Sequence, residues 1–96
     1  MRLTFSAHAK RRMRERKISS DLAKEVVTTA QYRFIDSATA HTVCVKRMMF
    51  RENERYIAVS LQVKTNAVKI VSIHPIRDRD FTSRIRSGRW KYETKS

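Results

Sequence analysis

Residues 56–64 read Tyr56-Ile57-Ala58-Val59-Ser60-Leu61-Gln62-Val63-Lys64 and alternate without a break between two kinds of side chain. One face of this stretch carries Ile57, Val59, Leu61 and Val63. The other face carries Tyr56, Ala58, Ser60, Gln62 and Lys64. A strict period of two is typical of a β-strand with one buried face, so this stretch predicts a central strand.

Three more runs rich in β-forming residues lie on either side of this strand, at residues 32–36, 42–51 and 67–74. The polar connections before and after residues 56–64 are short enough for hairpins. Pro75 lacks a backbone N–H and is therefore expected to end the last strand. The sequence thus predicts a four-stranded antiparallel meander.

Two helices are expected before the sheet. Ser6 can cap a helix over residues 7–17, and Ser19 or Ser20 can cap a second helix over residues 21–30. The second helix has an apolar stripe with a spacing of four residues, formed by Leu22, Val26 and Ala30. The expected fold class is α+β, with two N-terminal helices packed on a four-stranded antiparallel sheet.

The chain length of 96 residues fits one domain. We assign residues 1–79 to a single α+β domain and residues 80–96 to a basic C-terminal extension. Asp80 and Gly88 can begin and end a short helix in this extension. Beyond it, Trp90 and Tyr92 either cover the core, fray or stack on bases.

The charge balance is strongly positive, with 22 Lys and Arg against 9 Asp and Glu and a net charge of +13. Such an excess destabilises a compact chain through self-repulsion, which a bound polyanion offsets. Arginine outnumbers lysine, and a guanidinium can bind a phosphate with two hydrogen bonds. We therefore expect a nucleic acid as partner, RNA rather than DNA. The alternatives are charge for solubility alone, an anionic lipid surface or an acidic protein.

Several function classes are disfavoured. Cys44 is the only cysteine, so no internal disulfide can form, and Gly88 is the only glycine, so a glycine-rich phosphate loop is excluded. The chain has no apolar run of about 18 residues and no apolar N-terminal signal stretch, so we expect a cytoplasmic protein without a membrane segment. The acidic, His and Cys residues show no spacing typical of magnesium or zinc sites, and we expect no metal and no cofactor.

The first predicted helix places charge beside its buried side. At 100° per residue, His8, Arg12 and Arg16 border or enter the apolar side, whereas the other basic residues of this helix point away. A guanidinium there needs a carboxylate, a carbonyl or a phosphate, because burying it unpaired is costly. The alternative is that Arg12 and Arg16 lie over the core edge or pair with Asp36 or Glu25.

This stretch, His8-Ala9-Lys10-Arg11-Arg12-Met13-Arg14-Glu15-Arg16-Lys17-Ile18-Ser19, resembles the opening motif His-Ala-x-x-Arg-Met-x-x-Arg-Gly-Ile-Ser of a bacterial family of uncharacterised small proteins. That family is grouped by fold with barnase, EndoU, the colicin nucleases and RelE-like proteins. Many of these are metal-independent ribonucleases or toxins of toxin–antitoxin pairs. The resemblance implies a RelE/barnase-like fold. Lys17 stands at the motif's glycine, where a left-handed helix end costs on the order of 1 kcal/mol for a residue with a side chain, so the helix can end differently here.

Metal-free RNA cleavage needs a base, an acid and cations around the phosphate. Histidine suits the proton transfers, since its ordinary pKa of about 6.5 is close to working pH. We predict that the catalytic residues are His8, His74 and Arg12, with His41 a weaker candidate. The residues predicted to bind the nucleic acid are Arg16, Lys46, Arg47, Tyr56 and Lys64.

Two functions follow as hypotheses. The first is a metal-independent ribonuclease that acts as a toxin and is restrained by an acidic antitoxin. The second is a nucleic-acid-binding module or regulator without catalysis. A domain that binds an acidic protein is a third possibility.

Overall fold

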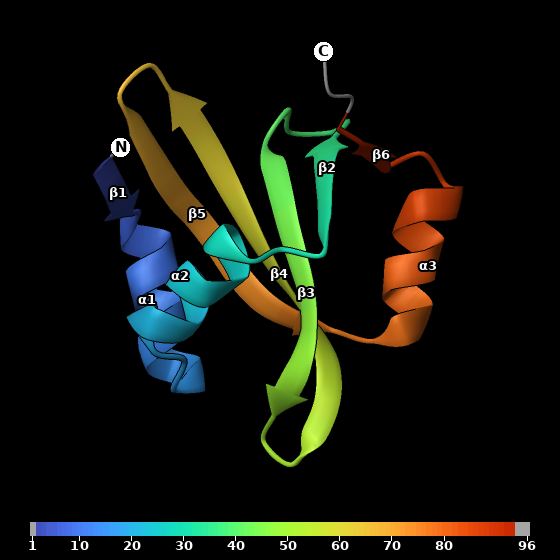
Figure 1. The fold of residues 1–96 in the computed structure, drawn as a ribbon, viewed down its shortest axis with the longest axis horizontal. Helices are drawn as coiled ribbons and strands as arrows, with labels where there is room; N and C mark the ends of the chain where they lie inside the picture. The colour runs from blue at the N-terminus through green and yellow to red at the C-terminus, as the bar shows by residue number, and fades with distance from the viewer. Residues whose placement is uncertain (1, 94–96) are drawn as a thin grey trace.

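The computed structural model describes residues 2–93 and has an α+β fold (Figure 1). In chain order the elements of this part are β1 (Arg2–Phe5), α1 (Ala7–Arg16), α2 (Ser20–Thr28), β2 (Tyr32–Asp36), β3 (Thr42–Phe50), β4 (Asn53–Lys64), β5 (Ala67–Ile76), α3 (Asp78–Arg86) and β6 (Trp90–Tyr92).

The strands form one mixed sheet with the order β1-β5-β4-β3-β2-β6. Strands β2 to β5 form the predicted antiparallel meander, β1 pairs in parallel with β5, and β6 pairs antiparallel with β2. The prediction of a purely antiparallel, four-stranded sheet is therefore wrong. The outer strands of a meander leave backbone groups unpaired, and short segments near the two ends of the chain supply their partners.

Pro75 does not end β5, contrary to the prediction, and the strand continues to Ile76 with Pro75 opposite Ile57. The cause lies at the edge of the sheet. Strand β1 pairs with β5 only from Ala67 to Ile70, so no strand lies outside β5 at Pro75. A missing N–H on an open edge removes no ladder hydrogen bond.

Each face of the sheet contributes residues to a buried core cluster. Ile57, Val59 and Leu61 of β4 lie in a core cluster with residues of α1 and α2, as the alternation predicts, whereas Val63 is 57% exposed near the end of the strand. The opposite face, predicted to lie outside the core, is also buried, because α3 packs on it. Its cluster consists of Phe34, Val43, Val45, Ala58, Ile76, Phe81 and Trp90.

The helices begin where the serines predict. The Ser6 hydroxyl accepts from the Ala9 amide, and the Ser19 hydroxyl accepts from the Leu22 amide. Lys17 ends α1 in the left-handed conformation, with φ 53° and ψ 47°, and thus adopts the helix end that the motif's glycine favours. No helix within residues 2–93 is long and apolar enough to cross a membrane.

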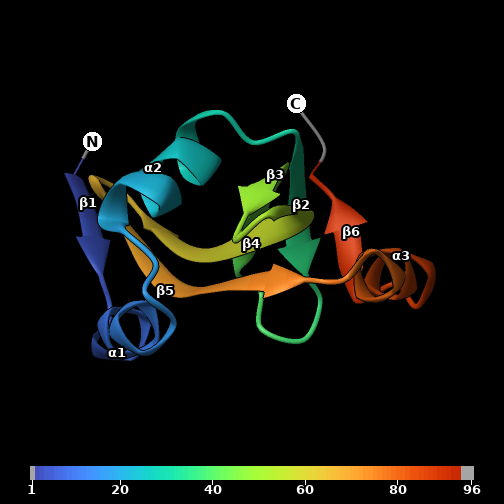
Figure 2. The ribbon, with the colours of Figure 1, turned by 90° about the horizontal axis from the view of Figure 1, so that it is seen from below.

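The positions of the three helices relative to β5 determine where the candidate site lies. Figure 2 shows α2 over one face of the sheet, while α1 and α3 lie on opposite sides of β5. Figure 1 shows the same separation of α1 and α3. Strand β5 therefore runs between the basic helix α1 and the helix α3.

Candidate nucleic-acid interface

A pocket of about 260 Å³ opens beside α3. Its lining comes from the loop after β2, from β4 and β5, from α3 and from the chain around the start of β6. Sites for drug-sized ligands usually have volumes of roughly 300–1,000 Å³, so this pocket is slightly smaller than such a site. The lining residues are Asp36, Thr39, His41, Ser60, Val71, Ser72, His74, Arg84, Arg89 and Trp90. We call this site the His74 pocket.

His74 lies on β5, paired with Ala58 of β4, and is half-buried. Burial, followed by the positive charges of Arg84, Arg16 and Arg12, lowers the pKa of His74 to about 4. The imidazole is therefore neutral at neutral pH. A neutral imidazole has one ring nitrogen free to accept a proton or a hydrogen bond.

Helix α1 is fixed to β5 at its first residues. The Ser6 amide donates to the Ile70 carbonyl at 2.8 Å, and the Ser6 hydroxyl donates to the Val71 carbonyl at 3.3 Å. Ala9, fully buried, packs in the first core cluster one turn later. These contacts place the next turns of α1, with their arginines, near β5.

Arg12 and Arg16 are half-buried on α1, as the helical periodicity predicts. Neither forms a salt bridge within the part of the chain that the structure describes. The alternative that they pair with Asp36 or Glu25 is wrong, because Asp36 binds Arg89 and Glu25 binds Lys46. Two guanidiniums near His74 thus keep charge that no carboxylate of residues 2–93 neutralises by contact.

A third such guanidinium belongs to Arg84 of α3. It lies over the ring of the buried Trp90, 5.0 Å from the ring centroid, and its charge acts on His74. Among residues 2–93 it too forms no salt bridge. Because an aromatic ring holds an arginine without cancelling its charge, Arg84 remains available to an anion. We call Arg12, Arg16 and Arg84 the arginine triad.

The other wall of the pocket is held by Asp36, which is only 6% exposed. Its Oδ1 accepts from Arg89 Nε at 2.8 Å and from the amides of Ala38 and Thr39 at 2.9 and 3.3 Å. Burial alone would raise the pKa of Asp36, but the hydrogen bond and charge of Arg89 and the two amides lower it. Asp36 therefore stays ionised and joins the β2–β3 loop to the chain before β6.

The structure separates the other predicted catalytic residue from this pocket. His8 is exposed in the first turn of α1, where its Nδ1 accepts from Arg11 Nη2 at 3.3 Å. It does not line the His74 pocket. Arg12 and Arg16 do not line the pocket either, but their charges act on His74, which does.

The remaining predicted binding residues also lie elsewhere. Lys46 binds Glu25 of α2 and Thr29, the residue that caps the end of this helix, and Arg47 binds Asp78 at 2.7 Å. The Tyr56 ring stacks on Phe81 in the second core cluster, with centroids 4.0 Å apart. Lys64 is exposed at the end of β4. None of these four residues lines the pocket.

Arg84, Arg89, Ser60 and Ser72 are pocket residues that the sequence reasoning did not select. Arg84 follows Phe81 by three residues and precedes Ile85, so the periodicity that located Arg12 and Arg16 would also have placed it beside the core face. Arg89 and Asp36 are 53 residues apart, and no local pattern connects them.

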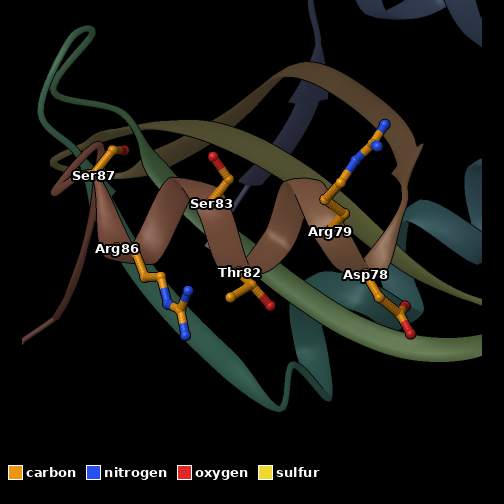
Figure 3. A pocket seen from close by; sticks show the side chains of 6 residues that line it. All are labelled: Asp78, Arg79, Thr82, Ser83, Arg86 and Ser87. Carbon is orange, nitrogen blue, oxygen red and sulfur yellow. The ribbon is translucent and has the colours of Figure 1, made fainter.

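A second hollow lies on the outer side of α3 (Figure 3) and is lined by Asp78, Arg79, Thr82, Ser83, Arg86 and Ser87. All six residues belong to one helix and the residue after it. Figure 3 shows Arg79, Ser83 and Ser87 along one side of the helix and Asp78, Thr82 and Arg86 along the other. With Asp78 bound to Arg47, this open surface lacks converging groups and is not a candidate site.

Metal ligands do not converge in the described chain: no three His, Cys, Asp or Glu side chains of residues 2–93 lie together in a group that could hold an ion.

A family model described as "Domain of unknown function (DUF4258)" matches residues 5–89. This range includes the arginine triad, His41 and His74. No curated protein and no solved structure matches the chain.

Proposed function

The chain belongs to the DUF4258 family of domains of unknown function, and we propose that it binds RNA at the His74 pocket and cleaves it without a metal ion. The observation that carries this proposal is the arginine triad around a neutral imidazole. The charges of all three guanidiniums act on His74, and a phosphodiester bound beside this residue would be attracted by them. The same charges stabilise the additional negative charge of a phosphorane.

RNA rather than DNA is the proposed substrate because of the chemistry that His74 allows. A neutral imidazole can take a proton from a ribose 2′-hydroxyl, which then attacks the adjacent phosphorus. DNA lacks this internal nucleophile. An imidazole with three nearby guanidiniums therefore favours RNA as the substrate.

The opening motif at residues 8–19 supports the same proposal, since it resembles the family grouped with barnase and RelE-like proteins. We propose on this basis a RelE/barnase-like ribonuclease that acts as a toxin of a toxin–antitoxin pair. An acidic antitoxin that covers the arginine triad would restrain it, because the net charge of +13 favours a negatively charged partner.

The proposal is tested by comparing two charge-matched variants. Arg12→Gln/Arg16→Gln removes two members of the triad, whereas Arg11→Gln/Arg14→Gln removes two other charges from the same helix. We expect the first variant to bind a single-stranded RNA about tenfold or more weakly than the second. Its binding should also fall less steeply with salt, by a log–log slope of roughly 0.7 for each phosphate that the variant no longer neutralises.

Wild-type protein should also cleave total RNA in the presence of EDTA, and the Arg12→Gln/Arg16→Gln variant should do so more slowly. Equal affinity and equal salt dependence in the two variants would contradict the proposed interface. Binding at the triad without any cleavage would contradict the ribonuclease activity and support an RNA-binding module without catalysis.

The toxin role predicts growth arrest when the wild-type chain is expressed in a bacterial host. Cells that express His74→Gln should grow normally at an equal level of folded protein, because binding alone leaves the RNA intact. Growth is followed as culture density, and protein level by immunoblot. Arrest by both proteins would attribute toxicity to RNA binding or to charge, and arrest by neither would contradict the toxin role.

A further inference from the structure

We infer that His41 is the second proton-transfer residue of the His74 pocket, the one that protonates the leaving oxygen. This inference rests on the proposed function, because it names a catalytic residue for the same RNA site. His41 and His74 line the same pocket, although they come from opposite sides of the β3-β4-β5 array. His41 is half-buried directly before β3, and His74 lies on β5.

The strand register places two hydroxyls between the histidines. Ser60 of β4 pairs with Val43 of β3 on one side and with Ser72 of β5 on the other. Strands β3 and β5 run in the same direction, since both pair antiparallel with β4. His41 precedes Val43 by two residues and His74 follows Ser72 by two residues, so the histidines are displaced from Ser60 in opposite directions along the strands. Ser60 therefore lies at the midpoint. From a strand spacing of about 4.8 Å and a rise of about 3.3 Å per residue, the Cα of each histidine is about 8 Å from that of Ser60.

This arrangement suits a phosphodiester seated over the serines. Ser60 and Ser72 can donate hydrogen bonds to its non-bridging oxygens. The imidazoles then approach from opposite directions, as an in-line displacement requires of a base and an acid. Both side chains can reach a group at the centre from that separation, whereas they are too far apart to contact each other instead.

The position of His41 is fixed by the loop that carries it. The Asp36 amide donates to the His41 carbonyl at 2.9 Å, and the Ala40 amide donates to the Asp36 carbonyl at 2.7 Å. The Asp36 carboxylate binds two further loop amides and Arg89. A catalytic group needs such a support, because rate depends steeply on small displacements. The Asp36–Arg89 pair thus acts as a positioning pair for His41.

The step balances without a co-reactant. Neutral His74 takes the proton of the 2′-hydroxyl, and the 2′-oxygen forms a bond to phosphorus. The bond between phosphorus and the 5′-oxygen breaks, and protonated His41 gives its proton to that oxygen. The products are a 2′,3′-cyclic phosphate and a 5′-hydroxyl, with His41 neutral and His74 protonated. Solvent exchange returns both imidazoles to their starting states.

The test uses an oligoribonucleotide that the wild type binds, in two forms. One has the natural linkage, and the other has a bridging 5′-sulfur at the cleaved position. A thiolate leaves without protonation, since thiols have pKa values of about 8.5, far below those of alcohols. We expect His41→Gln to slow cleavage of the natural linkage about a hundredfold and to cleave the sulfur linkage at nearly the wild-type rate. His74→Gln should be slow on both substrates.

His41→Asn provides a second variant, and the thermal midpoint and RNA affinity of each protein show whether the fold and the site persist. Equal loss on both linkages in folded His41 variants would overturn the inference while leaving His74 as the base. Wild-type rates in His41→Gln with loss in His8→Gln would also overturn it and return the acid to α1. If the wild-type protein binds RNA but cleaves neither linkage, both the inference and the proposed catalysis are overturned, and the RNA interface remains.

Discussion

Replacing His74 with glutamine is expected to slow RNA cleavage by about 100- to 10,000-fold, the usual contribution of a general base. Glutamine keeps a polar side chain that can hydrogen-bond but cannot accept the 2′-hydroxyl proton at neutral pH. Because the arginine triad remains, RNA affinity should change little. The measurement is single-turnover cleavage in EDTA beside an equilibrium binding assay.

The informative result is that His74→Gln cleaves RNA more slowly while its RNA affinity changes little. Since the pKa of His74 is lowered to about 4, the imidazole contributes no positive charge to binding at neutral pH. A large fall in affinity with an unchanged bound-state rate would make His74 a binding residue instead. Unchanged cleavage in His74→Gln would show that the base lies elsewhere or that another nuclease is present.

Strand β4 illustrates what periodicity can predict about this fold. Its alternation identified the strand, the face that packs under α1 and α2, and three of its core residues, because those depend on the local pattern. That pattern did not predict that β1 and β6 pair with the sheet. Each is so short that its pairing depends on an open strand edge formed by residues far away in sequence.

The candidate site also contains residues that a local pattern predicts and residues that only tertiary packing brings together. Helical periodicity located Arg12 and Arg16 beside the core, because a single helix determines that geometry. The pairing of Asp36 with Arg89 and the shared pocket of His41 and His74 come from tertiary packing. No spacing within a segment encodes them.

Net charge was the least specific guide to binding residues. Lys46 and Arg47 are basic and central, and yet each binds a carboxylate across the structure. Their charge is largely neutralised locally. The arginines that remain without a carboxylate contact in residues 2–93 are informative instead, and only coordinates distinguish the two groups.

Acid is expected to destabilise the folded protein through His74, with an effect on the order of 3 kcal/mol between pH 7 and pH 4. Burial and the arginine triad lower the pKa of His74 from 6.5 to about 4 in the folded state. In the unfolded chain His74 therefore takes up a proton below about pH 6.5, whereas in the folded chain it does so only near pH 4. The stability associated with neutral His74 is present above pH 6.5 and is lost as the pH falls through that window.

Urea unfolding of wild type and His74→Gln at pH 7, 6, 5 and 4 measures this effect. Both proteins lose carboxylate interactions on acidification, so only the difference between their unfolding free energies reports His74. That difference should shift by about 3 kcal/mol in favour of the glutamine variant at pH 4. His8→Gln, which removes an exposed histidine, should run parallel to the wild type. Parallel curves for His74→Gln would mean that folding does not lower the pKa of His74, and the acid destabilisation would then have to come from other groups.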